Sequence, residues 1–399
     1  MKIKKIEIKN FRGIESLDVD LCDSQEDALE LVAFIGANGC GKTSILEALL
    51  IALGHRDFLG TRANSKENLR VGSENYEISL TLGFGNQEEK LVFSSLDPLS
   101  NKKEIERICK RQLRDAKELQ VEYFSSWREP KLIGSVQITV GKIRRKPDRN
   151  DNIRLGEIKK YLVNFLARKK MEEPKPRVLW GKDDEPLEKI NKAWALFYPE
   201  KSGTFHVKPS GQAIESGFDL FYQNEREKTD ISVDALSSGE IEVFSILGWF
   251  AVKSVDHGII FIDEPELHLH PGWHRIILQS LRTVAPNSQI ICATHSPQTL
   301  SCVMAEEVFI LRKTKEKTQV LQPESVYGLD SNRILEDVML VPERPDEIKR
   351  KLESVFLRIE KGELETARNE ISELRIAIHD DPELVKAEAI LKRKELIKR

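Results

Sequence analysis

Two stretches of the sequence carry residue types that can hold a phosphate group and promote its transfer. The first is GANGCGKT at 36–43, which matches the pattern G-x-x-x-x-G-K-[ST] between an apolar strand and a helix. Its glycines let the backbone turn, so that N–H groups converge on phosphate oxygens at the positive end of the helix. Lys42 adds a charge for the β- and γ-phosphates, and the Thr43 hydroxyl can ligate Mg²⁺. The pattern predicts a phosphate-binding loop.

The second stretch, GIIFIDEPELHLHPGWH at 258–274, holds three acidic side chains and three histidines. A phosphate-binding loop requires an acidic residue on a second strand. Asp263 ends an apolar run and is expected to hold Mg²⁺, and Glu264 is placed to polarise an attacking water. The alternative is a zinc site built from the histidines, His268, His270 and His274. Two of these follow one another in an extended segment and no thiol accompanies them, so phosphate chemistry is favoured.

Two further motifs belong to the same order along the chain. LSSGE at 236–240 stands just before a helix, where a serine and a glycine backbone can bind an anion. ATHS places His295 at the tip of an expected strand, where an imidazole can reach a γ-phosphate. A lone histidine at a strand end is usually structural, and that alternative stays open.

These motifs need elements to position them, and the flanking pattern supplies strands and helices in alternation. Residues 1–55 read as three strands followed by a buried helix, KTSILEALLIAL. From about residue 203 short strands return, followed by the apolar helix EVFSILGWFAV, the strand GIIFI, a helix around 272–284 and the strand QIICAT. Alternation of this kind predicts a parallel sheet covered on both faces.

Composition places limits on the class of protein. Charged residues make up 32% and apolar residues 40% of the 399 residues, as in a globular protein rich in helix. The net charge of −3 excludes a uniformly basic nucleic-acid binder. Without an apolar run of about 18 residues or a signal peptide at the start, we expect no membrane span and a cytoplasmic location. The five cysteines form no CxxC pair and are expected to be reduced thiols.

The middle and the end of the chain differ from this pattern. Residues 99–122 lack helix breakers and predict an exposed helix, and 142–149 and 159–170 add positive charge. This basic insertion is either a DNA-binding surface or a solvated face, and the residues considered are Lys110, Arg111, Arg114, Arg144 and Arg145. After residue 342, apolar residues at helical spacing, a stop at Gly362 and a cap at Asp381 predict a small helical appendage.

The four motifs in this order resemble the ABC-type ATPase superfamily. KNFRGIESLDVDL at 9–21 and DEPELHLHP at 263–271 resemble its SMC, RecF and overcoming-lysogenization branch. The resemblance implies a Walker A loop, a Walker B pair of Asp263 and Glu264, a switch histidine at His295, and a signature that caps the ATP of a second subunit. It implies Thr43 and Asp263 as Mg²⁺ ligands, Glu264 and His295 as catalytic residues, and these nucleotide contacts: Asn38, Gly39, Cys40, Gly41, Lys42, Thr43, Ser44, Ser237, Ser238 and Gly239.

A second resemblance concerns the segment VYGLDSNRILEDVMLVPERP at 326–345, which looks like the tail motif of the PtuA-like ATPases of Septu and retron-linked antiphage systems. In that family the ATPase works with a separate HNH nuclease subunit. No spaced acidic set follows His295, so we expect no nuclease site in this chain. Ser238 and Glu240 replace the Gly and Gln of transporter signatures, and the glutamine-loop residue stays open among Gln112, Gln120 and Gln137.

We therefore expect an α/β fold, an ABC-ATPase head with a mixed sheet and a RecA-like core, with a helical insertion and a helical appendage. The expected parts are a head at 1–98 and 176–325, the basic insertion at 99–175 and a C-terminal partner-binding region at 326–399. The expected cofactors are ATP and Mg²⁺. The expected partners are a second copy of the chain in an ATP sandwich, an HNH nuclease and, through the insertion, DNA. A RecF-like or SMC-like DNA repair ATPase and a nucleotide-gated scaffold with little hydrolysis are the alternatives.

Overall fold

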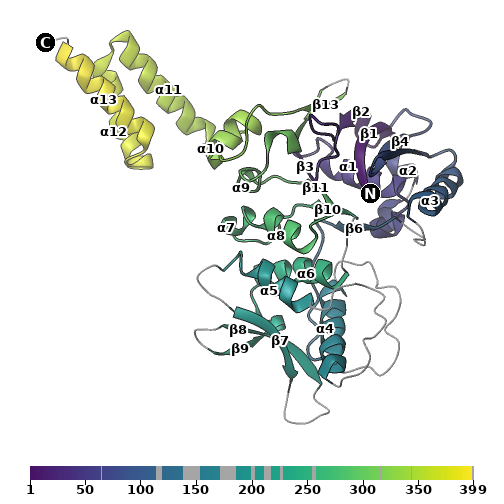
Figure 1. Ribbon diagram of the computed structural model, residues 1–399. Coiled ribbons are helices and arrows are strands. Elements are labelled where there is room, and N and C mark those ends of the chain that lie inside the picture. The colour runs from purple at the N-terminus through teal and green to yellow at the C-terminus, as the bar shows by residue number, and fades with distance from the viewer. Residues whose placement is uncertain are drawn as a thin grey trace. The chain divides into compact units, whose positions relative to one another are not determined.

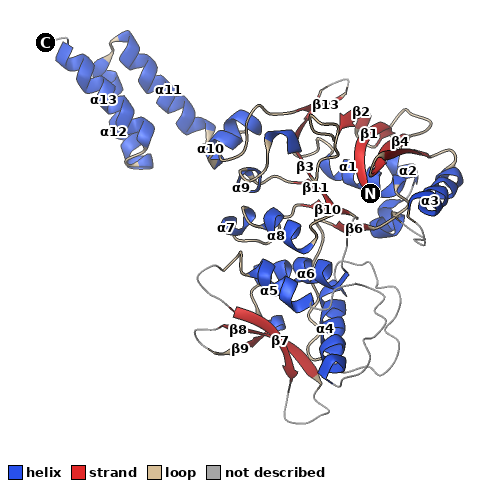
Figure 2. Cartoon of the chain, viewed as in Figure 1, coloured by secondary structure: helices blue, strands red, loops and turns tan. Residues whose placement is uncertain are grey.

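The chain divides into two units, Met1–Ile334 and Leu335–Arg399. The computed structural model describes residues 1–63, 65–113, 119–137, 153–170, 186–198, 203–210, 217–224, 228–253, 258–314, 317–342 and 344–397. The first unit combines strands and helices, and the second is helical (Figure 1, Figure 2).

A six-stranded sheet forms the centre of the first unit. Its strand order is β13-β12-β3-β11-β10-β6, and neighbours are parallel except for the antiparallel pair β12 and β13. The sheet is therefore mixed, as the resemblance implies, and not wholly parallel, as the alternation of strands and helices predicts; the carboxyl ends of its parallel strands lie along one edge. The strands are β3 (Leu31–Gly36), β6 (Val121–Phe124), β10 (Ile259–Asp263), β11 (Gln289–Ala293), β12 (Val308–Lys313) and β13 (Thr318–Leu321).

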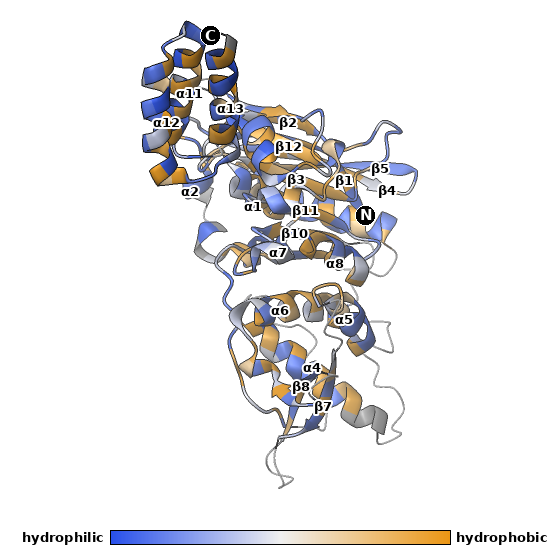
Figure 3. Cartoon of the chain, turned by 90° about the vertical axis from the view of Figure 1, so that its left-hand side faces the viewer, coloured by the Kyte–Doolittle hydropathy of each residue, from blue (hydrophilic) through white to orange (hydrophobic). Residues whose placement is uncertain are grey.

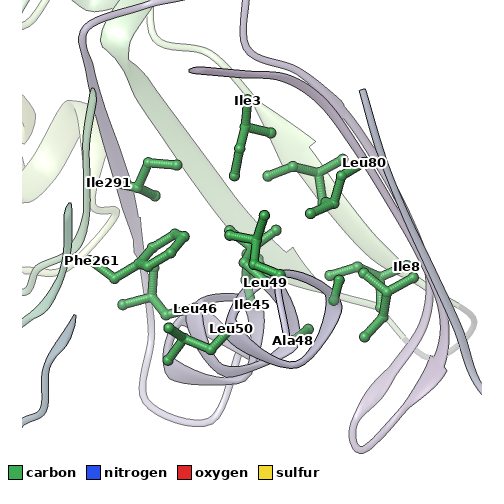
Figure 4. Packing of buried hydrophobic residues seen from close by; sticks show 14 of the residues in the cluster. Ile3, Ile8, Ile45, Leu46, Ala48, Leu49, Leu50, Leu80, Phe261 and Ile291 are labelled. Atoms are coloured by element: carbon green, nitrogen blue, oxygen red, sulfur yellow. The ribbon is translucent and has the colours of Figure 1, made fainter. Parts of the chain in front are cut away.

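Helix α1 (Lys42–Ala52) is the buried helix that the sequence predicts after the loop. It lies between the six-stranded sheet and an antiparallel sheet of order β2-β1-β4-β5 (Figure 4). Its side chains, including Leu46 and Leu49, pack against Phe261 of the central sheet and Ile3 of the antiparallel sheet. Each such side chain contributes about 1.5–3 kcal/mol by burial, so the start of α1 is firmly placed. The strands of this sheet are β1 (Lys2–Phe11), β2 (Ile14–Asp20), β4 (Glu77–Phe84) and β5 (Gln87–Ser94).

Helix α6 (Ser238–Lys253) is the second buried helix of this unit, and hydrophobic residues make up much of its length (Figure 3). It is covered by α4 (Arg154–Lys170), α5 (Pro186–Trp194) and α8 (Ile277–Val284). A small antiparallel sheet of order β7-β8-β9 lies beside these helices. Its strands are β7 (Gly203–Pro209), β8 (Phe218–Asn224) and β9 (Asp230–Ser232), and short helical segments elsewhere are α2 (Ser65–Asn68), α7 (Pro271–His274), α9 (Pro297–Leu300) and α10 (Ser331–Arg333).

The expectation of one helix over residues 99–122 is wrong. The helix α3 (Pro98–Gln112) ends earlier, and residues 121–124 form β6, the edge strand next to β10. These four residues, VEYF, are all buried, and β-branched and aromatic residues favour a strand when a sheet edge is available. The expected helix around 272–284 is likewise two helices, α7 and α8. Residues 142–149 lie outside the described part of the chain.

The second unit contains the helices predicted for the end of the chain, α11 (Asp346–Lys361), α12 (Leu364–Ile378) and α13 (Pro382–Ile397). They share a core of their own, which includes Leu352, Val355, Ile371 and Leu384. Gly362 ends α11 with φ 80°, and the Asp381 carboxylate accepts a hydrogen bond from the backbone N–H of Glu383, so both predicted boundary signals are confirmed.

None of the helices in the described ranges is long and apolar enough to span a lipid bilayer. The five cysteines are free thiols, as predicted.

Candidate nucleotide-binding site

The loop GANGCGKT connects β3 with α1, at the edge where the parallel strands end. Ala37, Asn38 and Gly39 are exposed, and Cys40 is buried beneath them. Gly36, with φ 143°, pairs with Leu311 of β12, and a Cβ at Gly36 would lie 2.4 Å from the Leu311 carbonyl oxygen. Only glycine fits there, because any side chain would collide with the neighbouring strand.

The N-terminus of α1 presents an uncompensated positive end. Its cap residue, Gly41, has a left-handed backbone with φ 110° and offers no side-chain acceptor. The first turn contains no acidic residue. The backbone N–H groups of the first helical residues, Lys42, Thr43 and Ser44, have no acceptor within the helix. This end is therefore suited to the oxygens of a phosphate group.

Lys42 is buried, with 6% of its surface exposed, and its ammonium lies against the loop. Its Nζ donates to the carbonyl oxygens of Gly36 at 2.9 Å and Ala37 at 3.1 Å. Burial lowers the pKa of Lys42, an effect that nearby Cys40 and Asp263 oppose. The ammonium is thus already directed into the loop that is expected to receive the phosphates.

Asp263 and Thr43 meet at the end of the central sheet. The Thr43 Oγ1 donates to Asp263 Oδ2 at 2.9 Å, although the two residues are far apart in sequence. Asp263 is the last residue of β10, and burial raises the pKa of its carboxyl, while hydrogen bonds from Thr43 and Ser126 oppose that rise. A carboxylate oxygen and a hydroxyl oxygen side by side are ligands that suit Mg²⁺. The two residues predicted as metal ligands are therefore adjacent.

Glu264 follows Asp263 in a strained backbone conformation, with φ 53°. Its N–H donates to the carbonyl of Ala293 at 2.8 Å, which holds it against the end of β11. Its partly buried carboxylate makes no hydrogen bond with the residues that the structure describes. A left-handed glutamate costs of order 1–3 kcal/mol, and such strain is typical of functional positions.

Arg128 is a buried residue that the sequence motifs do not reveal. Its Nη1 donates to the carbonyl oxygens of Ser125 at 2.9 Å and Asp263 at 2.7 Å, and its Nη2 donates to the carbonyl of Glu264 at 2.7 Å. Its Nε forms an ion pair with Glu242, one turn into α6. One guanidinium thus joins the strand β6, the end of β10 and the helix α6. No motif or periodic pattern in the sequence points to Arg128.

His295 lies just past β11, at the same edge of the sheet. The backbone N–H of His295 donates to Glu266 Oε1 at 3.0 Å, and the Thr294 hydroxyl donates to the same oxygen at 2.7 Å. Burial lowers the pKa of His295, and the positive charge of Lys42 lowers it further, so the neutral imidazole is favoured at pH 7.

The motif LSSGE forms the N-terminus of α6, and Ser237 and Ser238 are exposed there. Glu240 accepts hydrogen bonds from the Ser237 N–H at 2.8 Å and the Ser237 hydroxyl at 2.7 Å. The Tyr198 hydroxyl donates to the other Glu240 oxygen at 2.6 Å. Gly239 is buried, and a Cβ there would lie 2.9 Å from the His268 carbonyl. The motif is a capped helix start packed beside the segment that follows Glu264.

Two of the three histidines of the alternative zinc site have separate hydrogen-bond partners, and the third, His268, is exposed. His274 contacts the Ser296 hydroxyl at 2.9 Å and the Leu269 carbonyl at 3.1 Å. His270 caps α7 by accepting the N–H of Gly272 at 3.1 Å. Within the described residues, no three side chains from His, Cys, Asp and Glu converge as a metal site.

The three candidate glutamine-loop residues are dispersed. Gln112 ends α3 and donates to Gln87 and Glu89, Gln120 precedes β6, and Gln137 follows an isolated bridge to β8. The residue that lies beside Asp263 at the end of β6 is Ser126.

The predicted basic surface is only partly within the described chain. Arg111 forms an ion pair with Glu89 at 2.7 Å, and Lys110 is exposed. Arg114, Arg144 and Arg145 lie outside the described residues.

Comparisons with known proteins agree with this architecture. A family model described as "AAA domain, putative AbiEii toxin, Type IV TA system" matches residues 31–301. The chain is 23% identical to the Retron Ec83 probable ATPase of Escherichia coli, over 88% of this chain and 78% of that protein. It is 26% identical to the Septu protein PtuA of Bacillus mycoides, over 79% of this chain but 41% of that protein.

Among solved structures, an SMC head bound to the C-terminal winged-helix domain of ScpA is similar with a TM-score of 0.53. The identity is 14%, over 81% of this chain and 98% of that chain, and this likeness shows the fold alone. The predicted ABC-ATPase head fold is confirmed, and so is the predicted resemblance to the SMC and RecF branch and to PtuA-like ATPases.

Proposed function

Because this chain belongs to the family of AAA domains that this model describes, we propose that it is an ATPase that acts in antiphage defence and uses Mg²⁺. Two of its relatives are named a retron ATPase and a Septu protein, which supports the defence role. The observation that carries the proposal is the 2.9 Å hydrogen bond between Thr43 and Asp263, because it joins the end of the phosphate-binding loop to the acidic end of β10.

The residues around the Thr43–Asp263 hydrogen bond each have a separate role in the proposed phosphoryl transfer. The N–H groups at the start of α1 and the Lys42 ammonium bind phosphate oxygens, and Thr43 and Asp263 hold the metal. Mg²⁺ held by these two residues would neutralise charge on the transferred phosphoryl group. Glu264 orients the attacking water and accepts its proton, and the neutral imidazole of His295 donates a hydrogen bond toward the γ-phosphate. Asn38, Gly39, Cys40, Gly41 and Ser44 complete the nucleotide contacts.

A second copy of the chain would complete the site through the signature. Ser237 and Ser238 are exposed at the start of α6, whereas Gly239 is buried against the His268 carbonyl of the same chain. Backbone N–H groups at a helix start bind anions. We therefore infer a head-to-tail ATP sandwich, in which the signature of one copy closes over the nucleotide held by the other.

The partners in this proposal are a separate HNH nuclease, bound through the region 326–399, and DNA. The three-helix unit supports the first, because it has its own core and is not needed to build the nucleotide site. For DNA, the described part of the basic insertion at 99–175 offers the exposed Lys102, Lys103 and Lys110, whereas Arg111 is paired with Glu89. A head at 1–98 and 176–325, to which the strand β6 within 99–175 contributes an edge of the central sheet, completes the proposed division of the chain.

The hydrolysis claim is tested by Glu264→Gln in a steady-state assay with ATP and Mg²⁺. We expect kcat to fall by about 10² to 10⁴, with ATP binding retained, because the amide cannot accept the proton. Lys361→Ala, an exposed change in the second unit, is the control and should keep the wild-type rate. An unchanged kcat in Glu264→Gln would show that another residue activates the attacking water.

The assembly claims need separate measurements. Glu264→Gln with ATP should run as a dimer in light scattering, and Ser238→Arg, which adds bulk to the signature, should remain a monomer under the same conditions. Co-purification of the native operon with mass determination should recover an HNH subunit. A neighbouring set of DNA repair genes without a nuclease would instead favour the repair ATPase.

A further inference from the structure

The most heavily bonded side chain near the candidate site is one that no nucleotide-binding motif contains. Arg128 is 3% exposed and Glu242 is 1% exposed, and the two form an ion pair between the segment after β6 and the helix α6. The remaining donors of Arg128 reach backbone carbonyls of Ser125, Asp263 and Glu264. The guanidinium, with its donors in a rigid fork, therefore links three segments of the chain, which a flexible ammonium could not do in the same way.

The Arg128 contacts fall on the strained part of the backbone. Glu264 has φ 53°, and its carbonyl accepts from Arg128 Nη2 at 2.7 Å and from the N–H of Leu267 at 3.0 Å. A left-handed residue persists only where its surroundings hold it in place. Arg128 supplies that restraint, together with the bond from the Glu264 N–H to Ala293.

The same guanidinium extends the restraint to the helix that starts with the signature. Glu242 lies in the first turns of α6, a few residues after Ser237 and Ser238. Separating a buried ion pair leaves an uncompensated charge in a poorly solvated interior, so this link resists stretching. A displacement of the start of α6 would therefore act on the backbone of Asp263 and Glu264.

We propose that Arg128 is a positioning residue that holds Glu264 in its working orientation and makes that orientation depend on the position of α6. When the signature at the start of α6 caps a nucleotide, the resulting movement of α6 would then change the orientation of Glu264 in the same chain. For the role of Glu264 this inference rests on the proposed function, whereas the mechanical link itself does not.

The structure offers a matched control in a second buried link between the same two elements. Glu122 of β6 accepts from Trp249 Nε1 at 2.8 Å and from Lys253 Nζ at 2.8 Å, both on the last turns of α6. Glu122 is 5% exposed, so its burial is comparable with that of Arg128. Glu122→Gln should weaken the attachment of α6 to β6 without touching the Asp263–Glu264 backbone.

The test compares Arg128→Lys, Glu242→Gln and Glu122→Gln in the full chain, with melting temperature, ATP affinity, kcat and KM measured for each. We expect Arg128→Lys and Glu242→Gln to lower kcat by about 10²-fold with KM and ATP affinity changed by less than about threefold. The double variant should be no slower than Arg128→Lys alone, because the two residues act as a unit. Glu122→Gln should lower the melting temperature and leave kcat unchanged.

Hydrogen exchange at single amides gives a readout that needs no hydrolysis. The amides of Glu264 and Leu267 should exchange about tenfold faster in Arg128→Lys and in Glu242→Gln, and at the wild-type rate in Glu122→Gln. If both variants keep kcat within about twofold of wild type, or if Glu122→Gln slows turnover equally, the proposal is overturned. Should Arg128→Lys not fold, Glu242→Gln decides. If the wild type does not hydrolyse ATP, the proposed function fails, and the exchange rates alone decide on the link.

Discussion

The two helix starts expected to bind phosphate are built in opposite ways. The start of α1 is shaped by backbone alone, with a left-handed Gly41 as cap and no acidic residue in its first turn. The start of α6 is closed by its own side chains, since Glu240 accepts both the N–H and the hydroxyl of Ser237. The first end is open to an anion at all times, whereas the second must exchange an internal contact for an external one. We therefore expect a permanent anion site at the start of α1 and a conditional one at the start of α6.

The largest expected effect comes from removing the backbone freedom that shapes the first site. Gly36→Ala should lower the free energy of unfolding by about 3 kcal/mol, because its Cβ would meet the Leu311 carbonyl and its φ is left-handed. Gly39→Ala is the control, since a Cβ there meets nothing within 4 Å and only the backbone is strained, which costs about 1 kcal/mol. Urea unfolding measures both, and equal losses would contradict the close approach of β12.

The next effect concerns the charge at the open site. Lys42→Ala should weaken ATP binding by about 2 kcal/mol, or roughly 30-fold, because a buried ammonium that faces the phosphates is lost. Calorimetric titration measures the affinity, with Lys361→Ala as a control at an exposed position of the other unit. Unaltered affinity in Lys42→Ala would mean that the nucleotide binds elsewhere.

A smaller effect is expected at the closed site. Glu240→Ala removes the acceptor of the Ser237 N–H, as in the loss of a capping box, and should cost about 1 kcal/mol of unfolding free energy. The change also makes the start of α6 resemble that of α1. ATP-dependent dimerisation of the variant should therefore be retained or strengthened, and its loss in light scattering would show that the glutamate itself is needed for capping.

The smallest effect is expected for Tyr198→Phe. The ring keeps its contacts with Trp194 and Trp273, at centroid distances of 5.4 Å and 5.3 Å, and only the hydroxyl bonded to Glu240 is lost. The free energy of unfolding should fall by about 1 kcal/mol or less. A larger loss than in Glu240→Ala would show that Tyr198, and not the capping box, fixes the closed site.

Local patterns of the sequence were sufficient for the parts of the site that a few consecutive residues build. The loop at 36–43, the acidic end of β10 and the three C-terminal helices each combine a periodic run with its own boundary signal. Four-residue β6 has no such signal of its own, because a strand so short depends on β10 beside it. Its neighbours made the segment look like a continuation of a charged helix.

The rest of the site depends on contacts between residues far apart in the chain. Arg128 and Glu242 are 114 positions apart, and Tyr198 and Glu240 are 42 apart. Glu240 lies in LSSGE and Glu242 begins the predicted apolar helix, but nothing in the sequence joins them to Tyr198 and Arg128, so only the folded chain reveals the two pairs. Charge alone left Arg111 open between a DNA contact and a solvated face, and its ion pair with Glu89 could not be read from the sequence.

The left-handed backbone at Glu264 sets stability and activity against each other at a single position. Glycine would adopt φ 53° without strain. The folded chain would therefore be more stable with glycine at the position that now carries the proposed proton acceptor. Selection for stability alone would replace Glu264 with glycine. A search for stabilised variants of this protein should therefore find glycine at position 264, in variants that no longer hydrolyse ATP.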